Sequence, residues 1–205
     1  MHLEGLANYQ ATANITVQCV SQSVGNLKLK SVACIPKFLI YMPTRATGVQ
    51  LRKIIGVANY QFGMGIGQVL FNQATRISCS RKTGRIRHIY HGRKLLATLR
   101  PTDGFLALTV DAAKLLLTKM KTIPNNVIVQ SDVSEFIKSG GDVFARHITR
   151  APPSLRPLDE VIATDEGGEL LGVGSALLSG HDMAYFKRGV AVRIRKGTCE
   201  VTRET

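Results

Sequence analysis

The chain has 205 residues, 44% of them hydrophobic, and a formal net charge of +13, which fits one large folded domain or two small ones. No apolar run approaches the roughly 20 residues that cross a bilayer, so no membrane span is expected. The N-terminus has no basic cluster ahead of an apolar segment, so we expect no signal peptide and a cytoplasmic location. The four cysteines form no CxxC pair, so reduced thiols are expected unless the source is a hyperthermophile, where a disulfide stays open.

The positive charge is concentrated in the first half of the chain. Residues 1–102 hold 14 Lys and Arg and a single acid, Glu4, whereas residues 103–205 hold 13 residues of each sign. Eight cations and no carboxylate occur between residues 76 and 100, namely Arg76, Arg81, Lys82, Arg85, Arg87, Arg93, Lys94 and Arg100. A cluster of positive charges of this kind attracts a polyanion, because each neutralised phosphate of the polyanion releases counterions. A solvated basic face is the other explanation, but solvated faces usually interleave both signs.

Residues 1–44 carry little periodic pattern. The alternation of Ile15, Val17 and Cys19 indicates one short strand, and Val32 with Cys34 indicates another. We expect either a small sheet or an extension here, and the pattern indicates no function.

Residues 45–123 are predicted to form one basic α+β unit. Thr47 and Gln50 fit a capping box, which marks the start of an amphipathic helix. Hydrophobic periodicity and turn residues predict the remaining elements in this order: a short helix over 66–71, a hairpin of strands 85–90 and 93–98 with His91 and Gly92 in its turn, a strand over 105–108 and a helix over 110–121.

Residues 124–199 are predicted to form a small mixed sheet with two helices. Asp132 is expected to cap the first helix, and Gly140-Gly141 to end it in the left-handed conformation. Ser179 is expected to cap the second helix. The predicted strands are 127–129, 143–145, 161–164, 170–178 and 190–195.

No constellation of catalytic residues is visible. Gly63, Gly65 and Gly67 lack the preceding strand and the downstream residues of a nucleotide-binding loop, so they indicate a tight turn between helices. His88 and His91 lie on a strand and its turn, where their side chains do not converge on a metal but could add charge or stacking to a nucleic-acid surface. No nucleophile motif occurs and the acids fall in loops, so we expect no independent enzyme, metal or cofactor.

The basic hairpin is predicted to track phosphates along RNA. Arg85 and Arg87 are expected on one side of a strand, with Arg93 across the hairpin. Tyr90 and Phe105 fit either base stacking or a core position. The cations assigned to this surface are Arg81, Lys82, Arg85, Arg87, Arg93 and Lys94.

Three C-terminal segments follow a recognisable order: VSEFIKSGGDVFARHI at 133–148, RPLDEVIATD at 156–165 and ELLGVGSALLSGHDMAYFKRGVAVRIRKG at 169–197. This order resembles the PUA domain, the RNA-binding module named after pseudouridine synthases and archaeosine transglycosylases. The preceding LRKIIGVANYQFGMGIGQVLF and TGRIRHIYHGRKLLATLRPTDGFLALTVDAAKLLL resemble the pre-PUA domain of archaeosine tRNA-guanine transglycosylases. The resemblance covers about residues 49–197 and implies an archaeal source.

In that family the PUA domain grips the acceptor stem and CCA end of tRNA. The resemblance therefore implies RNA contacts for Lys138, Gly140, Gly141, Arg146, Arg193 and Arg195. The glycines would let the RNA backbone approach closely, and helix capping alone is the other explanation. The chain departs from the family at His147-Ile148, where Gly-Val is usual, and it contains no counterpart of the catalytic (β/α)₈ barrel.

Together the patterns and the resemblance predict an α+β chain in four parts: an N-terminal segment (1–44), a pre-PUA-like basic domain (45–123), a PUA pseudo-barrel of short mixed strands with two helices (124–199) and a tail (200–205). We expect a non-catalytic RNA-binding protein that binds the tRNA acceptor end as an accessory or split subunit of a transglycosylase system. Its expected partners are tRNA and a catalytic subunit. The alternative is a ribosome-assembly or translation-associated factor that binds ribosomal RNA.

Overall fold

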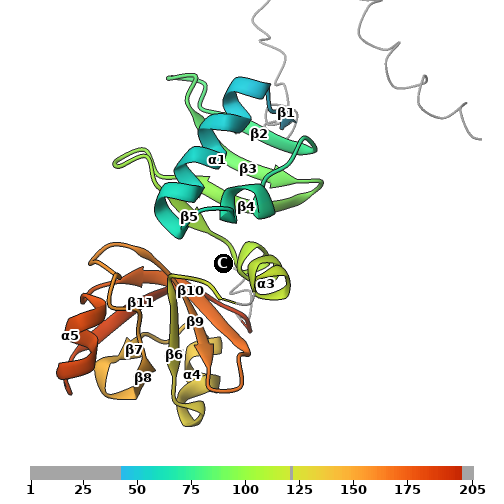
Figure 1. The fold of residues 1–205 in the computed structure, drawn as a ribbon. Helices are drawn as coiled ribbons and strands as arrows, with labels where there is room; N and C mark the ends of the chain where they lie inside the picture. Colours follow the sequence, from blue (N-terminus) through green and yellow to red (C-terminus); the bar gives the residue numbers. More distant parts are fainter. Residues whose placement is uncertain (1–42, 121, 200–205) are drawn as a thin grey trace, which may run out of the picture. The chain divides into compact units, whose positions relative to one another are not determined.

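The computed structural model describes residues 43–120 and 122–199, which belong to one compact unit (Figure 1). These residues form a five-stranded sheet, a six-stranded sheet and five α-helices, which confirms the predicted α+β class. The strands predicted around residues 15–19 and 32–34, and Cys19 and Cys34 within them, lie outside the described residues.

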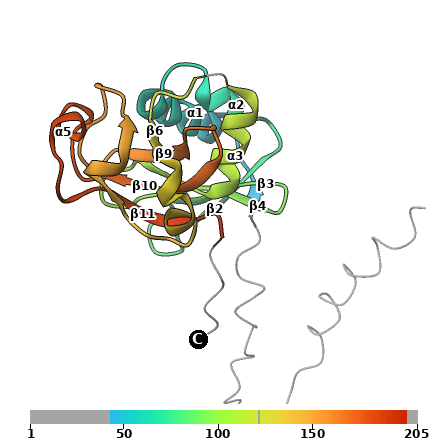
Figure 2. The same ribbon diagram turned by 90° about the horizontal axis from the view of Figure 1, so that it is seen from below.

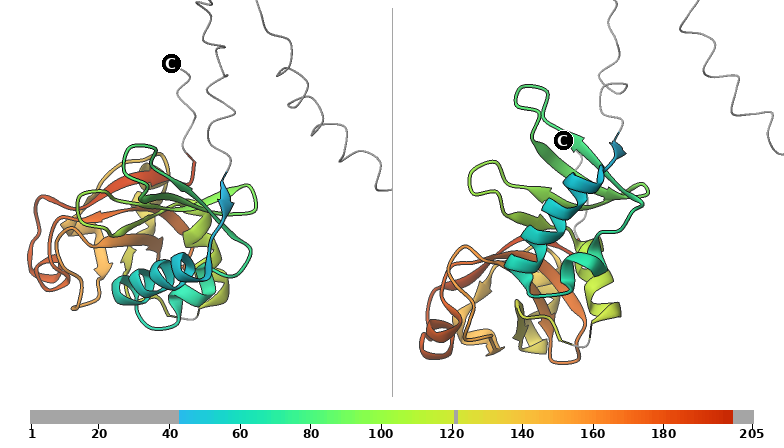
Figure 3. Two further views of the ribbon diagram at one scale, coloured as in Figure 1. Left: turned by 90° about the horizontal axis from the view of Figure 1, so that it is seen from above. Right: turned by 45° about the horizontal axis from the view of Figure 1, so that its top comes forward.

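The first sheet is antiparallel throughout, in the order β1-β2-β3-β4-β5. Helices α1 and α2 lie on one face of it (Figures 1 and 3). The elements of this part are β1 (Thr44–Arg45), α1 (Gly48–Phe62), α2 (Ile66–Leu70), β2 (Thr75–Cys79), β3 (Ile86–His91), β4 (Lys94–Leu99), β5 (Leu106–Leu108) and α3 (Val110–Lys119).

Helix α1 begins at the predicted capping box. The Thr47 hydroxyl accepts a hydrogen bond from the Gln50 amide (3.3 Å), and the Gln50 side chain accepts one from the Thr47 amide (2.9 Å). Two backbone donors that the helix cannot satisfy internally are thereby paired. The next helix approaches α1 closely at Gly67, where a Cβ atom would lie 2.5 Å from the Ile55 carbonyl oxygen. The glycine-rich segment is therefore a tight connection between two packed helices.

The β3–β4 hairpin differs in register from the prediction. His91 pairs with Lys94, so the two-residue turn consists of Gly92, with φ of 60°, and Arg93. The predicted turn of His91 and Gly92 is wrong by one residue, because pairing extends one residue further than the hydrophobic alternation indicates. The β2–β3 pairing also skips Arg87, which makes that residue the extra one of a β-bulge.

The hydrophobic core of the first part crosses into the second. Ile77 and Ile89 lie opposite each other on the helix-covered face of the first sheet, and both are buried. The same cluster includes Ile162, Leu170 and Val173 from the second sheet. Burial of this shared apolar surface stabilises the contact between the two sheets.

The second sheet has the order β7-β11-β10-β9-β6-β8, in which β6 and β9 are parallel and the other neighbours antiparallel. Figure 2 shows β9, β10 and β11 beside one another, with α5 at one end of them. The elements of this part are β6 (Asn126–Val129), α4 (Ser134–Lys138), β7 (Val143–Phe144), β8 (Ile148–Arg150), β9 (Glu160–Asp165), β10 (Leu170–Ala176), α5 (Gly180–Tyr185) and β11 (Val190–Gly197).

The two helices of this part begin differently. Ser179 caps α5 as predicted, because its hydroxyl accepts a hydrogen bond from the Asp182 amide at 3.1 Å. The predicted cap of α4 by Asp132 is wrong: this residue lies in a 3₁₀ turn, and α4 follows with Val133 at its N-cap and no side-chain cap. The turn pairs the amides of Val133 and Ser134 with the carbonyls of Gln130 and Ser131. Gly140 has the predicted left-handed conformation, with φ of 95°, whereas for Gly141 the prediction is wrong, because its φ is not in the left-handed range.

The backbone around His147 differs from the predicted extended structure. Residues 145–147 form a 3₁₀ turn rather than the end of the predicted strand 143–145. The turn leads directly into β8, which pairs antiparallel with β6. The unusual His147-Ile148 pair therefore sits at a defined junction between a turn and an edge strand of the sheet.

Candidate nucleic-acid interface

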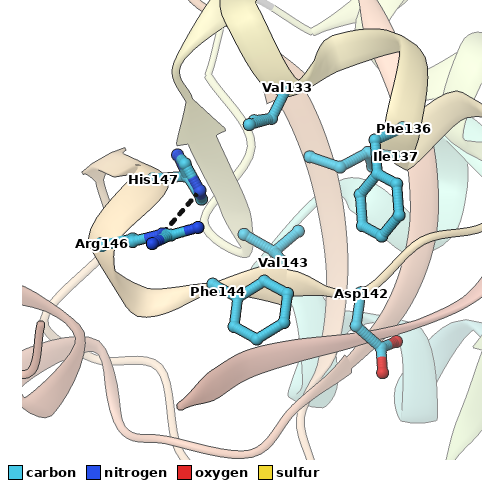
Figure 4. A pocket seen from close by; sticks show the side chains of 8 residues that line it. All are labelled: Val133, Phe136, Ile137, Asp142, Val143, Phe144, Arg146 and His147. Carbon is cyan, nitrogen blue, oxygen red and sulfur yellow. Dashed lines mark hydrogen bonds between the residues drawn. The ribbon is translucent and has the colours of Figure 1, made fainter. Parts of the chain in front are cut away.

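A pocket of about 320 Å³ lies between α4 and the segment that carries β7 and the following turn (Figure 4). Two phenylalanine rings at this pocket are open to solvent, because Phe136 is 55% and Phe144 39% exposed. Ile137 and Val143 are buried beneath them. We call this the phenylalanine pocket, and its lining residues are Val133, Phe136, Ile137, Asp142, Val143, Phe144, Arg146 and His147.

Gly141 makes room for the Phe136 ring. A Cβ atom on Gly141 would lie 2.3 to 2.5 Å from three atoms of that ring. The Gly141 amide donates to the Phe136 carbonyl at 2.9 Å, which closes the turn at the end of α4. The space that the sequence resemblance assigns to an approaching RNA backbone is thus occupied by the protein's own aromatic ring.

Arg146 presents the positive charge of this pocket. Its Nε donates to Nε2 of His147 at 2.9 Å, and Nδ1 of His147 lies 3.1 Å from the Gln130 side-chain oxygen. Because Nε2 accepts, the imidazole proton belongs on Nδ1, where it is donated to Gln130. The Arg146 guanidinium also lies 6.0 Å from the Phe144 ring centroid, at the edge of cation–π range. Its terminal nitrogens remain available for an anion.

Lys138 is engaged in ion pairs within the chain. Its Nζ lies 2.9 Å from a Glu169 carboxylate oxygen and 3.2 Å from one of Glu135, and its side chain is only 12% exposed. Hydrogen bonds to Glu169 and then Glu135 raise the pKa of Lys138. The two carboxylates neutralise the charge that would attract a phosphate, so the geometry favours a structural role for this lysine.

Arg195 is also paired within the protein, although its side chain is 43% exposed. Its guanidinium contacts both carboxylate oxygens of Glu160 and donates to the Leu108 carbonyl at 2.7 Å. The Leu108 amide in turn donates to Glu160 at 2.9 Å, so the cluster joins β5 of the first sheet to β9 and β11 of the second. Burial, opposed chiefly by Arg195, raises the pKa of Glu160. The neighbouring Arg193 is exposed.

The cations of the basic hairpin fall at two separated ends of β3. Arg81, Lys82 and Arg85 belong to the loop that precedes β3, and all three are exposed. Arg93 was predicted to lie across the hairpin from Arg85; this is wrong, because Arg93 is in the turn at the opposite end of β3. Lys94, next to it, lies 3.8 Å from Asp111 on the surface, a contact that contributes little. The structure does not bring the six residues together on one face.

The face of the first sheet opposite α1 and α2 carries two cross-strand rows, in which six of the eight residues are polar or aromatic. The register places Arg45, Arg76, Tyr90 and Leu95 in one row and Ser78, His88, Thr98 and Ala107 in the other. None of these eight residues belongs to either hydrophobic cluster of the described chain. We call this the open face after its exposed residues Arg45 and Arg76, although Ser78 in the second row is buried. Burial, and then the Arg87 guanidinium, lower the pKa of His88.

Sequence reasoning missed Phe136 and Phe144 as functional candidates. Phe136 precedes the buried Ile137, and neighbouring helix positions point about 100° apart, so the two side chains leave the helix in different directions. Phe144 likewise follows the buried Val143 on a strand, where alternate side chains face opposite sides. These alternations were the available signal. Among the described residues no group of three or more His, Cys, Asp or Glu could hold a metal ion.

Comparison with family models assigns both halves of the described structure. Residues 52–122 match the patch-forming domain C2 of tRNA-guanine transglycosylase, and residues 125–198 match the PUA domain. Residues 125–198 are a PUA domain. The phenylalanine pocket, Lys138, Arg193 and Arg195 therefore belong to the PUA domain, and the basic hairpin and the open face lie mostly in the C2 domain.

Curated relatives support the same assignment. The chain is 39% identical over 147 residues to the tRNA-guanine(15) transglycosylase of Methanobrevibacter smithii, which covers 72% of this chain and 22% of the relative. It is 39% identical over 163 residues to the enzyme of the same name from Pyrococcus furiosus, covering 80% and 27%. The chain thus spans about a quarter of the length of these relatives. The identities confirm the predicted resemblance to archaeal transglycosylases.

Solved structures share the fold. A hypothetical protein of Pyrococcus horikoshii matches with a TM-score of 0.65 at 23% identity, covering 78% of this chain and 96% of the other. A conserved PUA domain protein from Thermoplasma acidophilum matches with a TM-score of 0.58 at 20% identity, with the same coverages. At these identities the two matches show that the fold is shared.

Proposed function

We propose that this protein binds tRNA without catalysing its modification, and that its PUA domain holds the unpaired 3′ CCA end. The observation that carries the proposal is the phenylalanine pocket, which places two exposed rings beside the free end of an arginine. Unpaired bases stack on aromatic rings, and arginine binds phosphate with paired donors. Both features suit the single-stranded end of a tRNA.

The proposed context is tRNA base modification. The relatives are named for transglycosylation of guanine 15, and the similarity falls on their C2 and PUA domains. We propose that this chain acts as an accessory to a catalytic subunit of that kind. Exposed arginines of the C2 domain would add contacts to the phosphates, which makes the affinity for tRNA depend on salt.

Binding of a tRNA transcript with and without its CCA end tests the proposal. Phe144→Ala should weaken binding of intact tRNA by about 1–3 kcal/mol, the value of one base stacked on an aromatic ring. It should have little effect on trimmed tRNA, since the stacked base is then absent. Phe186→Ala is the matched control, because Phe186 is 52% exposed in the same domain but does not line the pocket.

Three results would contradict the proposal. Equal affinity for intact and trimmed tRNA would show that the PUA domain does not hold the CCA end. Preferential binding to ribosomal RNA, measured in competition with tRNA, would favour the ribosome-associated alternative. Modification of tRNA by the purified chain alone would overturn the non-catalytic role.

A further inference from the structure

A second cavity, of about 510 Å³, lies where the C2 domain meets the PUA domain. Its walls come from the C-terminal end of α1, the turn before β5 and the segment 154–159 that precedes β9. At Gly63, a Cβ atom would lie 3.1 Å from the Pro124 side chain, so the two domains approach closely on this wall. We call this the tyrosine cavity; its volume is in the range of small-ligand sites.

An aromatic pair forms one side of the tyrosine cavity. The rings of Tyr60 and Phe105 have centroids 6.1 Å apart and planes inclined by 20°. Tyr60 is 81% exposed, so most of its ring has no contact within the protein. An aromatic ring held nearly parallel to another and open to solvent provides a surface on which a flat heterocycle can stack.

The turn that carries Phe105 is held by several hydrogen bonds. The Phe105 amide donates to the Asp103 carboxylate at 3.0 Å, and the Arg100 amide donates to the Phe105 carbonyl at 2.8 Å. The Arg100 side chain pairs with Asp103 at 2.9 Å and lies 6.0 Å from the Phe105 ring centroid. Phe105, for which sequence allowed either stacking or core packing, is therefore fixed at the cavity wall.

The amide side chains of the cavity wall are already paired. The Gln61 side chain donates to the Leu106 carbonyl and accepts from the Leu106 amide, each at 2.8 Å. The Asn125 side chain donates to the backbone carbonyls of Gln61 and Glu160. These bonds make the wall rigid, so an entering ligand need not order it.

Arg156 supplies the positive charge of the cavity. Its backbone amide donates to the Asp159 carboxylate at 2.8 Å, while no hydrogen bond or ion pair joins its guanidinium to another described residue. Leu158, in the same loop, has a left-handed φ of 73°. Its backbone amide donates a hydrogen bond to the Ala176 carbonyl at 2.8 Å, which holds this conformation in place. Strained conformations of this kind in non-glycine residues often mark functional loops.

We propose that the tyrosine cavity binds a single unstacked nucleotide, with its base against Tyr60 and its phosphate on Arg156. Asp159 can accept from an amino or hydroxyl group of the same nucleotide, and its charge disfavours a second phosphate. The nucleotide can be a splayed-out residue of RNA, which rests on the proposed function, or a free mononucleotide. An aromatic face beside an unpaired arginine fits a nucleotide better than it fits an aliphatic or acidic peptide.

Binding measurements on the full chain test this proposal. Tyr60→Ala and Arg156→Ala should each weaken binding of a tRNA transcript roughly 5- to 150-fold, whereas Tyr60→Phe should keep most of the affinity because it keeps the ring. Met64→Ala is the matched control, because Met64 is 86% exposed near Tyr60 but lies outside the cavity. Thermal unfolding of each variant checks that the exposed substitutions leave the fold intact.

The choice of RNA separates this proposal from the previous one. The loss caused by Tyr60→Ala should be the same for intact and CCA-trimmed tRNA, since the phenylalanine pocket is a different site. CMP and a uridine octanucleotide serve as further probes: Tyr60-dependent binding of CMP identifies a free nucleotide, and binding of the octanucleotide alone identifies RNA. If Tyr60→Ala and Arg156→Ala bind all four probes as tightly as Met64→Ala does, the tyrosine cavity is not a nucleotide site. This conclusion holds whether or not intact tRNA binds more tightly than CCA-trimmed tRNA.

Discussion

At Gly141 the backbone lies directly beneath the Phe136 ring, which leaves no space for a side chain. We expect Gly141→Ala to displace the half-exposed ring, at a cost of about 1 kcal/mol in the free energy of unfolding, and to weaken tRNA binding. Gly56→Ala is the control, because nothing lies within 4 Å of the added Cβ in the exposed middle of α1. That substitution should stabilise the protein by about 0.5–1 kcal/mol. Urea unfolding and tRNA titration measure both effects; unchanged tRNA binding by Gly141→Ala would contradict the role given to Phe136.

His88 on the open face makes stability depend on pH. Its pKa in the folded protein is lowered from the ordinary value of 6.5 by burial and by Arg87, so the unfolded chain binds more protons. The contribution of neutral His88 to the free energy of unfolding is complete above pH 6.5 and is lost as the pH falls through the pKa of the folded state. His88→Asn, which removes the titration, should flatten the fall in unfolding free energy between pH 7.5 and 5. His91→Asn is the comparison, and an equal flattening there would show that the effect is not specific to His88.

Among the secondary-structure elements, the sequence predicted best those whose signals are local. The helices α1 and α5 begin directly after their caps, Thr47 and Ser179, because each hydroxyl accepts a hydrogen bond from the amide three residues further along the chain. The start of α4 was missed because a 3₁₀ turn replaces the side-chain cap. The Arg87 bulge and the turn at Gly92-Arg93 were missed because register depends on the partner strand rather than on the alternation within one strand.

The cap of α5 can be tested directly. Ser179→Ala removes the acceptor for the Asp182 amide and should lower the free energy of unfolding by about 1 kcal/mol. Ser131→Ala, at the start of the 3₁₀ turn before α4, should change it by less than about 0.5 kcal/mol, because no side chain caps that turn. Equal effects of the two substitutions in urea unfolding would mean that the Ser179 hydrogen bond contributes nothing to stability.

At the scale of the whole molecule, charge predicted an RNA-binding protein but not which cations are free to bind RNA. Lys138 and Arg195 match the family surface in sequence, yet each is paired with carboxylates in the folded chain. Arg195 meets Glu160, 35 residues away, and the Leu108 carbonyl, 87 residues away. Such partners depend on how the two sheets meet, which no local pattern contains. Arg146, by contrast, takes its position from the adjacent His147 and keeps its terminal nitrogens free.

The cluster of Arg195 and Glu160 therefore stabilises the junction of the two domains, and Arg195→Ala tests this. The substitution leaves a fully buried carboxylate without its cation, which should cost about 3 kcal/mol at neutral pH. Burial already raises the pKa of Glu160 above its ordinary 4.5, and loss of Arg195 raises it further. When the pKa of a group is higher in the folded than in the unfolded chain, the group stabilises the folded chain below its ordinary pKa. This stabilisation is lost as the pH rises through the pKa of the folded state. The deficit against the wild type should therefore shrink as the pH falls from 8 to 5.

Arg193→Ala is the matched control for this substitution, since Arg193 lies two residues earlier on β11 and forms no ion pair with another described residue. It should change the free energy of unfolding by less than about 0.5 kcal/mol and reduce tRNA affinity modestly, with a smaller dependence on salt. A deficit of Arg195→Ala that does not vary with pH would mean that Glu160 is not the group left uncompensated. If Arg195→Ala kept full stability but lost tRNA binding, Arg195 would be an RNA contact, and another interaction would have to hold the two domains together.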